Sequence, residues 1–212
     1  MRDPFVTKNI LKWYDLNKRS LPWRKNVSKE KRQYNTLISE FMLQQTQVAT
    51  VIPYFNKFVK EIPNIKKLAS VDNKKLIKLW EGLGYYSRAR NLKKAAQSVI
   101  KNFNGVIPDN FDDLKSLSGI GDYTANAILA IAFNKPYIPL DGNVERIIKR
   151  YLYLKKEKEI QKENLIEKKS ILGFSNRSSD YAQALMEFGA LVCKPTNPLC
   201  CQCPITKKCK SF

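Results

Sequence analysis

Apolar residues recur at spacings of three and four along this chain, whereas the strict alternation typical of strands never persists. Turn-forming residues interrupt the pattern, as at Leu21-Pro22, Asn104-Gly105 and the polar stretch 25–33, which we expect to be a loop. The pattern therefore predicts an all-α protein. The predicted helices cover residues 7–17, 34–43, 48–60, 73–79, 87–103, 111–116, 122–133, 142–151, 158–172 and 179–192.

Charge adds an expectation about partners. The chain has 38 basic and 19 acidic residues, a formal net charge of +19 and a pI of about 9.7. Such an excess indicates a polyanionic partner, although a lysine-biased composition also contributes to it. No apolar run reaches the roughly 18 residues of a membrane span, and the polar start does not resemble a signal peptide, so we expect a cytoplasmic protein without a membrane partner.

Two residue types limit the chemistry. The chain contains no histidine, which excludes Ser-His-Asp triads and histidine-ligated zinc. All five cysteines lie in the last 20 residues, in the pattern Cys193-x6-Cys200-x2-Cys203-x5-Cys209 with Cys201 left over. Cysteines this closely grouped favour a metal centre over disulfides, and four thiolates suit either an iron–sulfur cluster or structural zinc.

A glycine-containing turn precedes the predicted helix 122–133. The segment reads Leu117-Ser118-Gly119-Ile120-Gly121, and its two glycines allow the backbone to approach a ligand closely. The helix start behind them would direct amide hydrogens at an anion, as in a phosphate-binding turn. A plain helix–helix turn would have the same local pattern.

Two carboxylates are candidates for catalysis. Asp141, in Leu140-Asp141-Gly142-Asn143-Val144-Glu145-Arg146, precedes a predicted helix, where aspartate commonly serves only as an N-cap. Glu40 lies in Ser39-Glu40-Phe41-Met42-Leu43-Gln44-Gln45-Thr46-Gln47-Val48. A lone glutamate in a helix is usually exposed, so local sequence alone does not assign it a role.

Together these motifs resemble those of MutY-type adenine DNA glycosylases of the helix-hairpin-helix, endonuclease III superfamily. The resemblance extends from Trp13 to Cys209 and includes Leu21-Pro22-Trp23-Arg24 and the segment Trp80-Glu81-Gly82-Leu83-Gly84-Tyr85-Tyr86-Ser87-Arg88-Ala89-Arg90-Asn91-Leu92. It implies a two-lobed all-α fold, with a six-helix barrel lobe over 26–134 and a cluster lobe from 1–25 and 135–212. It also implies a [4Fe-4S] cluster on Cys193, Cys200, Cys203 and Cys209, with Cys201 as a non-ligand.

The resemblance further implies a role for each site residue. Glu40 would be the catalytic acid, Asp141 would stabilise the sugar cation, and Tyr123 would pack beside the sugar. Trp23 and Arg24 would line the base pocket. The residues expected to contact DNA are Gln45, Thr46, Tyr85, Ser87, Arg88, Gly119 and Gly121.

The expected activity is monofunctional hydrolysis of the bond to an adenine mispaired with 8-oxoguanine or guanine. The expected partner is double-stranded DNA containing a mispair, bound by a monomer associated with the nucleoid. Alternatives are a thymine glycosylase acting on T:G mispairs and a non-catalytic DNA-binding module; an endonuclease III activity would need lysine at the position of Tyr123. Family members usually continue into a domain that contacts 8-oxoguanine, so we expect a chain ending at Phe212 to prefer 8-oxoguanine less strongly.

Overall fold

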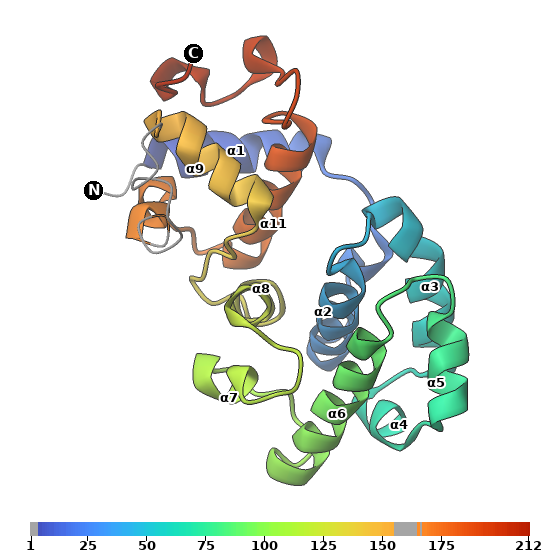
Figure 1. Cartoon of the computed structure of the whole chain (residues 1–212). Coiled ribbons are helices and arrows are strands. Elements are labelled where there is room, and N and C mark those ends of the chain that lie inside the picture. The colour runs from blue at the N-terminus through green and yellow to red at the C-terminus, as the bar shows by residue number, and fades with distance from the viewer. Residues whose placement is uncertain (1–3, 155–164, 166) are drawn as a thin grey trace. The chain divides into compact units, whose positions relative to one another are not determined.

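The computed structural model describes residues 4–154, 165 and 167–212, and within them the regular structure is entirely helical, as the sequence pattern predicts (Figure 1). The chain divides into two compact units. A continuous unit comprises Ser20–Phe133, and a discontinuous unit comprises Met1–Arg19 together with Asn134–Phe212.

The continuous unit is built around one deeply buried helix, α2 (Lys29–Leu43). It packs against α8 (Asp122–Phe133) and α6 (Ser87–Asn102) (Figure 1). It also contacts η1, which precedes it in the chain, and α3, which follows it. The remaining elements of this unit are η1 (Pro22–Arg24), α3 (Val48–Glu61), α4 (Ile65–Ser70), α5 (Asn73–Trp80) and α7 (Phe111–Lys115).

The helix α2 begins five residues earlier than predicted. Lys29–Gln33 is polar and lacks an apolar stripe, so it resembles a loop in the sequence. The Ser28 side chain accepts a hydrogen bond from the Lys31 amide at 3.2 Å and caps the helix, while Glu30 lies in the first turn. The short helix α4 was also not predicted. It begins with the same kind of cap, in which Asn64 Oδ1 accepts a hydrogen bond from the Lys67 amide at 2.9 Å.

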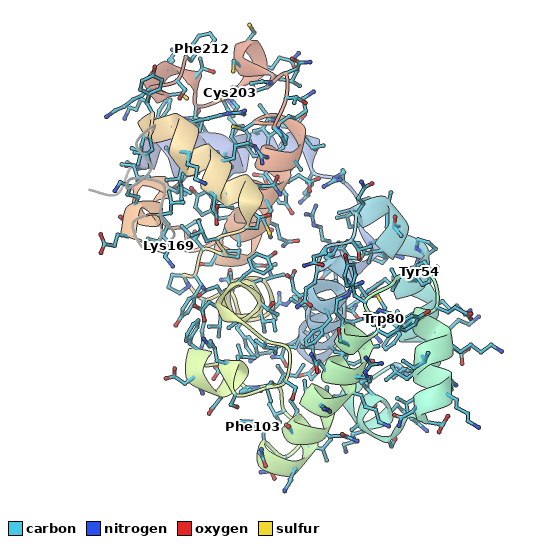
Figure 2. The ribbon with its side chains drawn as sticks, viewed as in Figure 1. Tyr54, Trp80, Phe103, Lys169, Cys203 and Phe212 are labelled. Carbon is cyan, nitrogen blue, oxygen red and sulfur yellow. The ribbon has the colours of Figure 1, made fainter. Side chains whose placement is uncertain are left out.

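The core of the continuous unit contains aromatic side chains with little or no exposure. Phe41, Phe55, Phe58 and Trp80 are each at most 1% exposed, and Phe58 and Trp80 meet edge to face with ring centroids 5.9 Å apart. Figure 2 shows Trp80 among the helices of this unit. This aromatic pair packs α3 against α5.

The discontinuous unit brings the two ends of the chain together. Helix α1 (Pro4–Asn17) packs against α11 (Ser178–Leu191), which also packs against α9 (Gly142–Leu152) (Figure 1). Short 3-10 turns follow at η3 (Lys169–Leu172), η4 (Cys200–Gln202) and η5 (Thr206–Lys208). Of the predicted helix 158–172, residues 158–164 and 166 lie outside the described residues, and its last four residues form η3.

A buried carboxylate ties α1 to α11. Glu187 is 1% exposed and accepts three hydrogen bonds from Arg19: from its backbone amide at 3.0 Å, from its Nε at 2.7 Å and from its Nη2 at 2.9 Å.

No helix among residues 4–154, 165 and 167–212 is both long and apolar enough to cross a bilayer.

Candidate functional site

Glu40 lies in the most buried part of the continuous unit. Its exposed fraction is 4%, and it lies within the run of buried α2 residues Gln33–Met42. Glutamate is rarely buried to this extent unless its carboxyl group is paired or has a chemical function. The structure therefore removes the ordinary alternative for this residue, an exposed glutamate on a helix surface.

One turn after Glu40, α2 ends beside the glycine-containing turn. The amide Nε2 of Gln44 lies 3.4 Å from the carbonyl oxygen of Gly119 and 3.4 Å from the hydroxyl of Thr124. Gln44 is the C-cap residue of α2 and follows Glu40 by four residues, which is about one helical turn. The buried acid is thus one helical turn from a contact with the glycine-containing turn of residues 117–121, which is called the hairpin below.

The two hairpin glycines have different surroundings. Gly119 has a φ of +81°, and a Cβ there would lie 2.8 Å from Asn91 Cβ and 2.9 Å from Phe41 Cε1. At Gly121, an added Cβ would have no heavy atom within 4 Å. Gly119 is therefore required by the backbone and the packing, whereas Gly121 leaves open space in front of the first turn of α8.

Tyr123 is the second residue of α8 and is half-buried. It follows Asp122, which pairs with Lys115 of α7. Tyr123 therefore lies at a helix start, one residue from the amides of the hairpin.

On η1, Trp23 packs edge to face against Phe55 with ring centroids 5.3 Å apart, and Arg24 is half-buried beside it.

The residues expected to probe the DNA strand lie on two turns with unusual backbone. Gln45 has a φ of 56° and is exposed, and Tyr85 has a φ of 47° and is 63% exposed. Thr46 follows Gln45 and is half-buried, whereas Ser87 is exposed at the first turn of α6. A left-handed backbone at non-glycine residues is strained and persists only where surrounding contacts hold it.

Arg88 does not have the role expected from the sequence. We expected its side chain to reach phosphates, but it is 7% exposed and its guanidinium donates hydrogen bonds to backbone carbonyls. Its burial lowers the pKa of the guanidinium. The alternating charged and apolar residues at the start of α6 give no sign of this, because an arginine there usually faces solvent.

In the discontinuous unit, Asp141 is the N-cap of α9. One carboxylate oxygen accepts the Val144 amide at 2.7 Å, and the other accepts Asn143 Nδ2 at 2.8 Å. Asn143 in turn packs closely against Gly189 of α11, where an added Cβ would lie 2.5 Å from Asn143 Cβ. The carboxylate is thus held at the positive end of a helix by two donors.

Two arginines on α9 continue from this cap toward the cysteines. Arg146 Nη2 donates to Asn143 Oδ1 at 2.7 Å, and its Nε donates to the Cys193 carbonyl at 2.7 Å. Arg150 lies one turn later, with Nη1 3.6 Å from Cys193 Sγ and 2.6 Å from the Lys194 carbonyl. Sequence reasoning assigned no role to these arginines, although their spacing of four residues places both on one face of α9.

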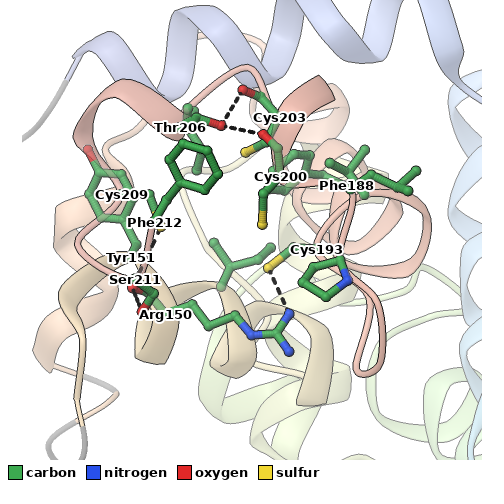
Figure 3. Close-up of a pocket in the computed structure, with 15 residues that line it drawn as sticks. Arg150, Tyr151, Phe188, Cys193, Cys200, Cys203, Thr206, Cys209, Ser211 and Phe212 are labelled. Carbon is green, nitrogen blue, oxygen red and sulfur yellow. Dashed lines mark hydrogen bonds between the residues drawn. The ribbon is translucent and has the colours of Figure 1, made fainter.

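The four cysteines predicted as ligands line one cavity. This cavity has a volume of about 250 Å³, and its other lining residues include Ile147, Tyr151, Phe188 and Ile205 (Figure 3). Thr206 Oγ1 holds the loop by donating toward the carbonyls of Cys200 and Cys203, each at 2.8 Å. Cys201, in contrast, is exposed and is not among the lining residues.

These residues fit an iron–sulfur cluster. The cavity brings together four cysteine thiols, which is the set of ligands that a protein supplies to such a cluster. Within the described part of the chain, no three His, Cys, Asp or Glu residues lie close enough to hold a single metal ion. Burial raises the pKa of the Cys193 thiol, and the hydrogen bond from Arg150 opposes this shift.

The comparison with family models gives one match. Residues 38–172 match the model described as HhH-GPD superfamily base excision DNA repair protein. This range contains the last six residues of α2 with Glu40, the hairpin, Tyr123 and Asp141, and it ends before the cysteine loop. The endonuclease III-like fold of this family usually binds a [4Fe-4S] cluster.

Several curated relatives are similar over nearly the whole chain. The adenine DNA glycosylase of Buchnera aphidicola subsp. Baizongia pistaciae is 42% identical over 97% of this chain and 58% of its own length. Those of Rattus norvegicus and Homo sapiens are 41% and 40% identical over 96% of this chain, which covers 41% and 38% of them. The chain thus spans about half the length of these relatives.

Solved structures share the fold. A thermostable thymine-DNA glycosylase superposes with a TM-score of 0.85 at 27% identity, covering 97% of this chain and 94% of that one. An endonuclease III in a non-covalent DNA complex superposes with a TM-score of 0.77 at 23% identity, covering 98% and 93% respectively, which supports the fold alone. The family match and the identity to relatives agree: this chain belongs to the HhH-GPD superfamily of base excision DNA repair proteins.

Proposed function

We propose that this chain is a monofunctional DNA glycosylase that removes adenine mispaired with 8-oxoguanine or guanine. The observation that carries the proposal is the position of Glu40, a carboxyl group 4% exposed and one helical turn from the contact between Gln44 and the hairpin. A buried acid beside a phosphate-binding turn suits a reaction on a nucleotide of a DNA strand. The relatives named adenine DNA glycosylase support adenine as the leaving base.

The reaction divides between two carboxyl groups, as in glycosidases. Glu40 donates a proton to N7 of an extruded adenine, and the C1′–N9 bond breaks with its electron pair going to the base. The Asp141 carboxylate stabilises the resulting sugar cation. Water then adds to C1′ and returns a proton to Glu40, which leaves free adenine and an abasic sugar. Tyr123 packs beside the sugar and offers no amine for strand cleavage.

We further propose that Cys193, Cys200, Cys203 and Cys209 hold a [4Fe-4S] cluster. Their spacing resembles that of the cluster loop of endonuclease III-type proteins, and together with their arrangement around one cavity it supports this choice over structural zinc. When bound, such a cluster would supply four iron–thiolate bonds that hold the loop on the core of the discontinuous unit. The protein would act as a cytoplasmic, nucleoid-associated monomer on double-stranded DNA containing a mispair.

A thymine glycosylase acting on T:G mispairs is the second candidate. The superposition on a thermostable thymine-DNA glycosylase favours it. The identity to adenine DNA glycosylases is higher, at 40–42% against 27%, and so we place adenine first.

The test is single-turnover base release from duplexes that carry A opposite 8-oxoguanine, A opposite G, T opposite G, and A opposite T. We expect release of adenine from the first two. Glu40→Gln should remove this release while leaving the dissociation constant for the same duplex nearly unchanged, because it deletes a proton donor and no phosphate contact. Glu30→Gln is the matched control, because Glu30 is exposed on the same helix and should keep full activity.

The outcomes separate the candidates. Release from T:G alone would assign the chain as a thymine glycosylase. Tight binding to mispaired duplexes without release of any base would assign it as a binding module. Equal losses of affinity and rate in Glu40→Gln would contradict the role of Glu40 as an acid.

A further inference from the structure

Arg88 connects the two turns that carry Gln45 and Tyr85. Although it is charged, it is 7% exposed, and its Cζ lies 5.7 Å from the ring centroid of Trp80 and 5.6 Å from that of Tyr85. Each of its two terminal nitrogens donates hydrogen bonds to one of the two turns. Nη1 donates to the carbonyls of Phe41 at 3.3 Å, Met42 at 2.8 Å and Gln44; Nη2 donates to those of Leu83 at 3.1 Å and Gly84 at 3.2 Å.

Two of these carbonyls belong to the residues directly before the strained positions. Gln44 precedes Gln45, whose φ is 56°, and Gly84 precedes Tyr85, whose φ is 47°. A non-glycine residue in this region holds its conformation only when its surroundings enforce it. One guanidinium therefore fixes the peptide plane that leads into each of the two exposed probing residues.

Only arginine has the geometry for this contact. Its guanidinium is planar and rigid, and it presents several N–H groups in a fixed fork, so one side chain can serve two chain segments at once. A lysine ammonium has a similar charge but no fork, and it could satisfy only one of the two turns in a defined direction. The indole Nε1 of Trp80 adds to the same arrangement with a contact of 3.3 Å to the Gly84 carbonyl.

We propose that Arg88 is a positioning residue that makes Gln45 and Tyr85 act on the duplex as one unit. This inference rests on the proposed function, in which these two side chains probe the DNA strand around the mispair. Because the same side chain holds both turns, neither residue changes its direction independently of the other. Discrimination between mispaired and fully paired DNA then depends on Arg88, even though its guanidinium faces carbonyls and not phosphates.

The test is DNA binding by Arg88→Lys in the Glu40→Gln background, where no turnover occurs. Affinity for an A:8-oxoguanine duplex should fall on the order of tenfold, a change equivalent to about 1.4 kcal/mol, while affinity for a fully paired duplex stays within about twofold. Arg90→Gln is the matched comparison, because Arg90 is exposed two residues later on α6. It should weaken both duplexes alike and reduce the salt dependence of binding, as loss of a phosphate contact does.

A second measurement distinguishes a local effect on the two turns from a general loss of structure in Arg88→Lys. Hydrogen–deuterium exchange of Arg88→Lys should rise together in residues 43–47 and 82–87 and remain unchanged in α3 and α8. Faster exchange in only one of the two turns, or throughout the continuous unit, would overturn the proposal. Equal weakening of both duplexes would also overturn it and make Arg88 a phosphate contact.

The coupling itself is measured by combining Gln45→Ala with Tyr85→Ala. With Arg88 present, the two effects on mispair affinity should be non-additive, and in Arg88→Lys they should become additive. Additive effects in both backgrounds would contradict the coupling. Failure of the proposed function would give a different result, because the protein with Glu40 and Arg88 intact would then release no adenine from the mispaired duplexes.

Discussion

Replacing the two hairpin glycines by alanine should separate stability from DNA binding. In Gly119→Ala, the new Cβ meets Asn91 and Phe41 at 2.8–2.9 Å on a backbone with φ +81°. The left-handed backbone costs alanine about 1–2 kcal/mol, and overpacking against a fully buried ring adds about 1–3 kcal/mol. For a chain of this length, a total of about 2–5 kcal/mol lowers the Tm by roughly 4–20 °C.

Gly121→Ala should behave in the opposite way. Its Cβ meets no atom of the protein, so the free energy of unfolding should change by less than about 1 kcal/mol. The methyl group would, however, occupy the open space in front of the α8 amides, where we expect a phosphate. Affinity for duplex DNA should therefore fall about tenfold, or about 1.4 kcal/mol.

The assay is thermal unfolding by circular dichroism, paired with fluorescence-anisotropy titration of a labelled duplex at one fixed salt concentration. Equal losses of Tm in the two variants would refute the packing argument. An unchanged DNA affinity in Gly121→Ala would refute the assignment of this turn as a phosphate site.

Three further predictions concern other parts of the molecule. Cys203→Ser should reduce the iron content per chain, whereas Cys201→Ser should leave it unchanged; equal iron in both variants by elemental analysis would contradict the ligand set. Tyr123→Lys should introduce strand cleavage through a Schiff base, checked by borohydride trapping, and no trapped adduct would count against the position of Tyr123. Glu187→Ala should lower the free energy of unfolding by about 3 kcal/mol, because it leaves the Arg19 donors without their carboxylate, and a loss below 1 kcal/mol in a denaturant titration would refute this.

Helix positions were predictable where an apolar stripe marks them. Residues 122–133 were predicted with the observed bounds of α8, because its buried face is almost entirely apolar. The start of α2 was not predictable in this way, since its first turns are polar and are stabilised by the Ser28 cap. Periodicity detects burial and says nothing about a helix that extends into solvent beyond it.

The chemistry of the site was partly predictable. The motifs identified Glu40 and the cysteines as candidates, and the structure adds that Glu40 is 4% exposed and that the four cysteines share a cavity with apolar side chains. Arg88 was misjudged because nothing local predicts that a guanidinium will turn inward to bind carbonyls of the turn just before it and of a second turn far away in the sequence. Such a contact depends on the tertiary structure, with sequence separations of up to 47 residues.

The discontinuous unit has a consequence for the order of events during synthesis. Residues of α1 and of the segment directly after it pair with partners far along the chain: Thr7 with Leu172, Asp15 with Arg177, and Arg19 with Glu187. The ribosome adds roughly 5–20 residues per second, so the continuous unit can fold several seconds before α11 has been translated. Throughout that interval, Ile10 and Tyr14 of α1 lack the helix α11 against which they pack, so α1 exposes an apolar face on the nascent chain.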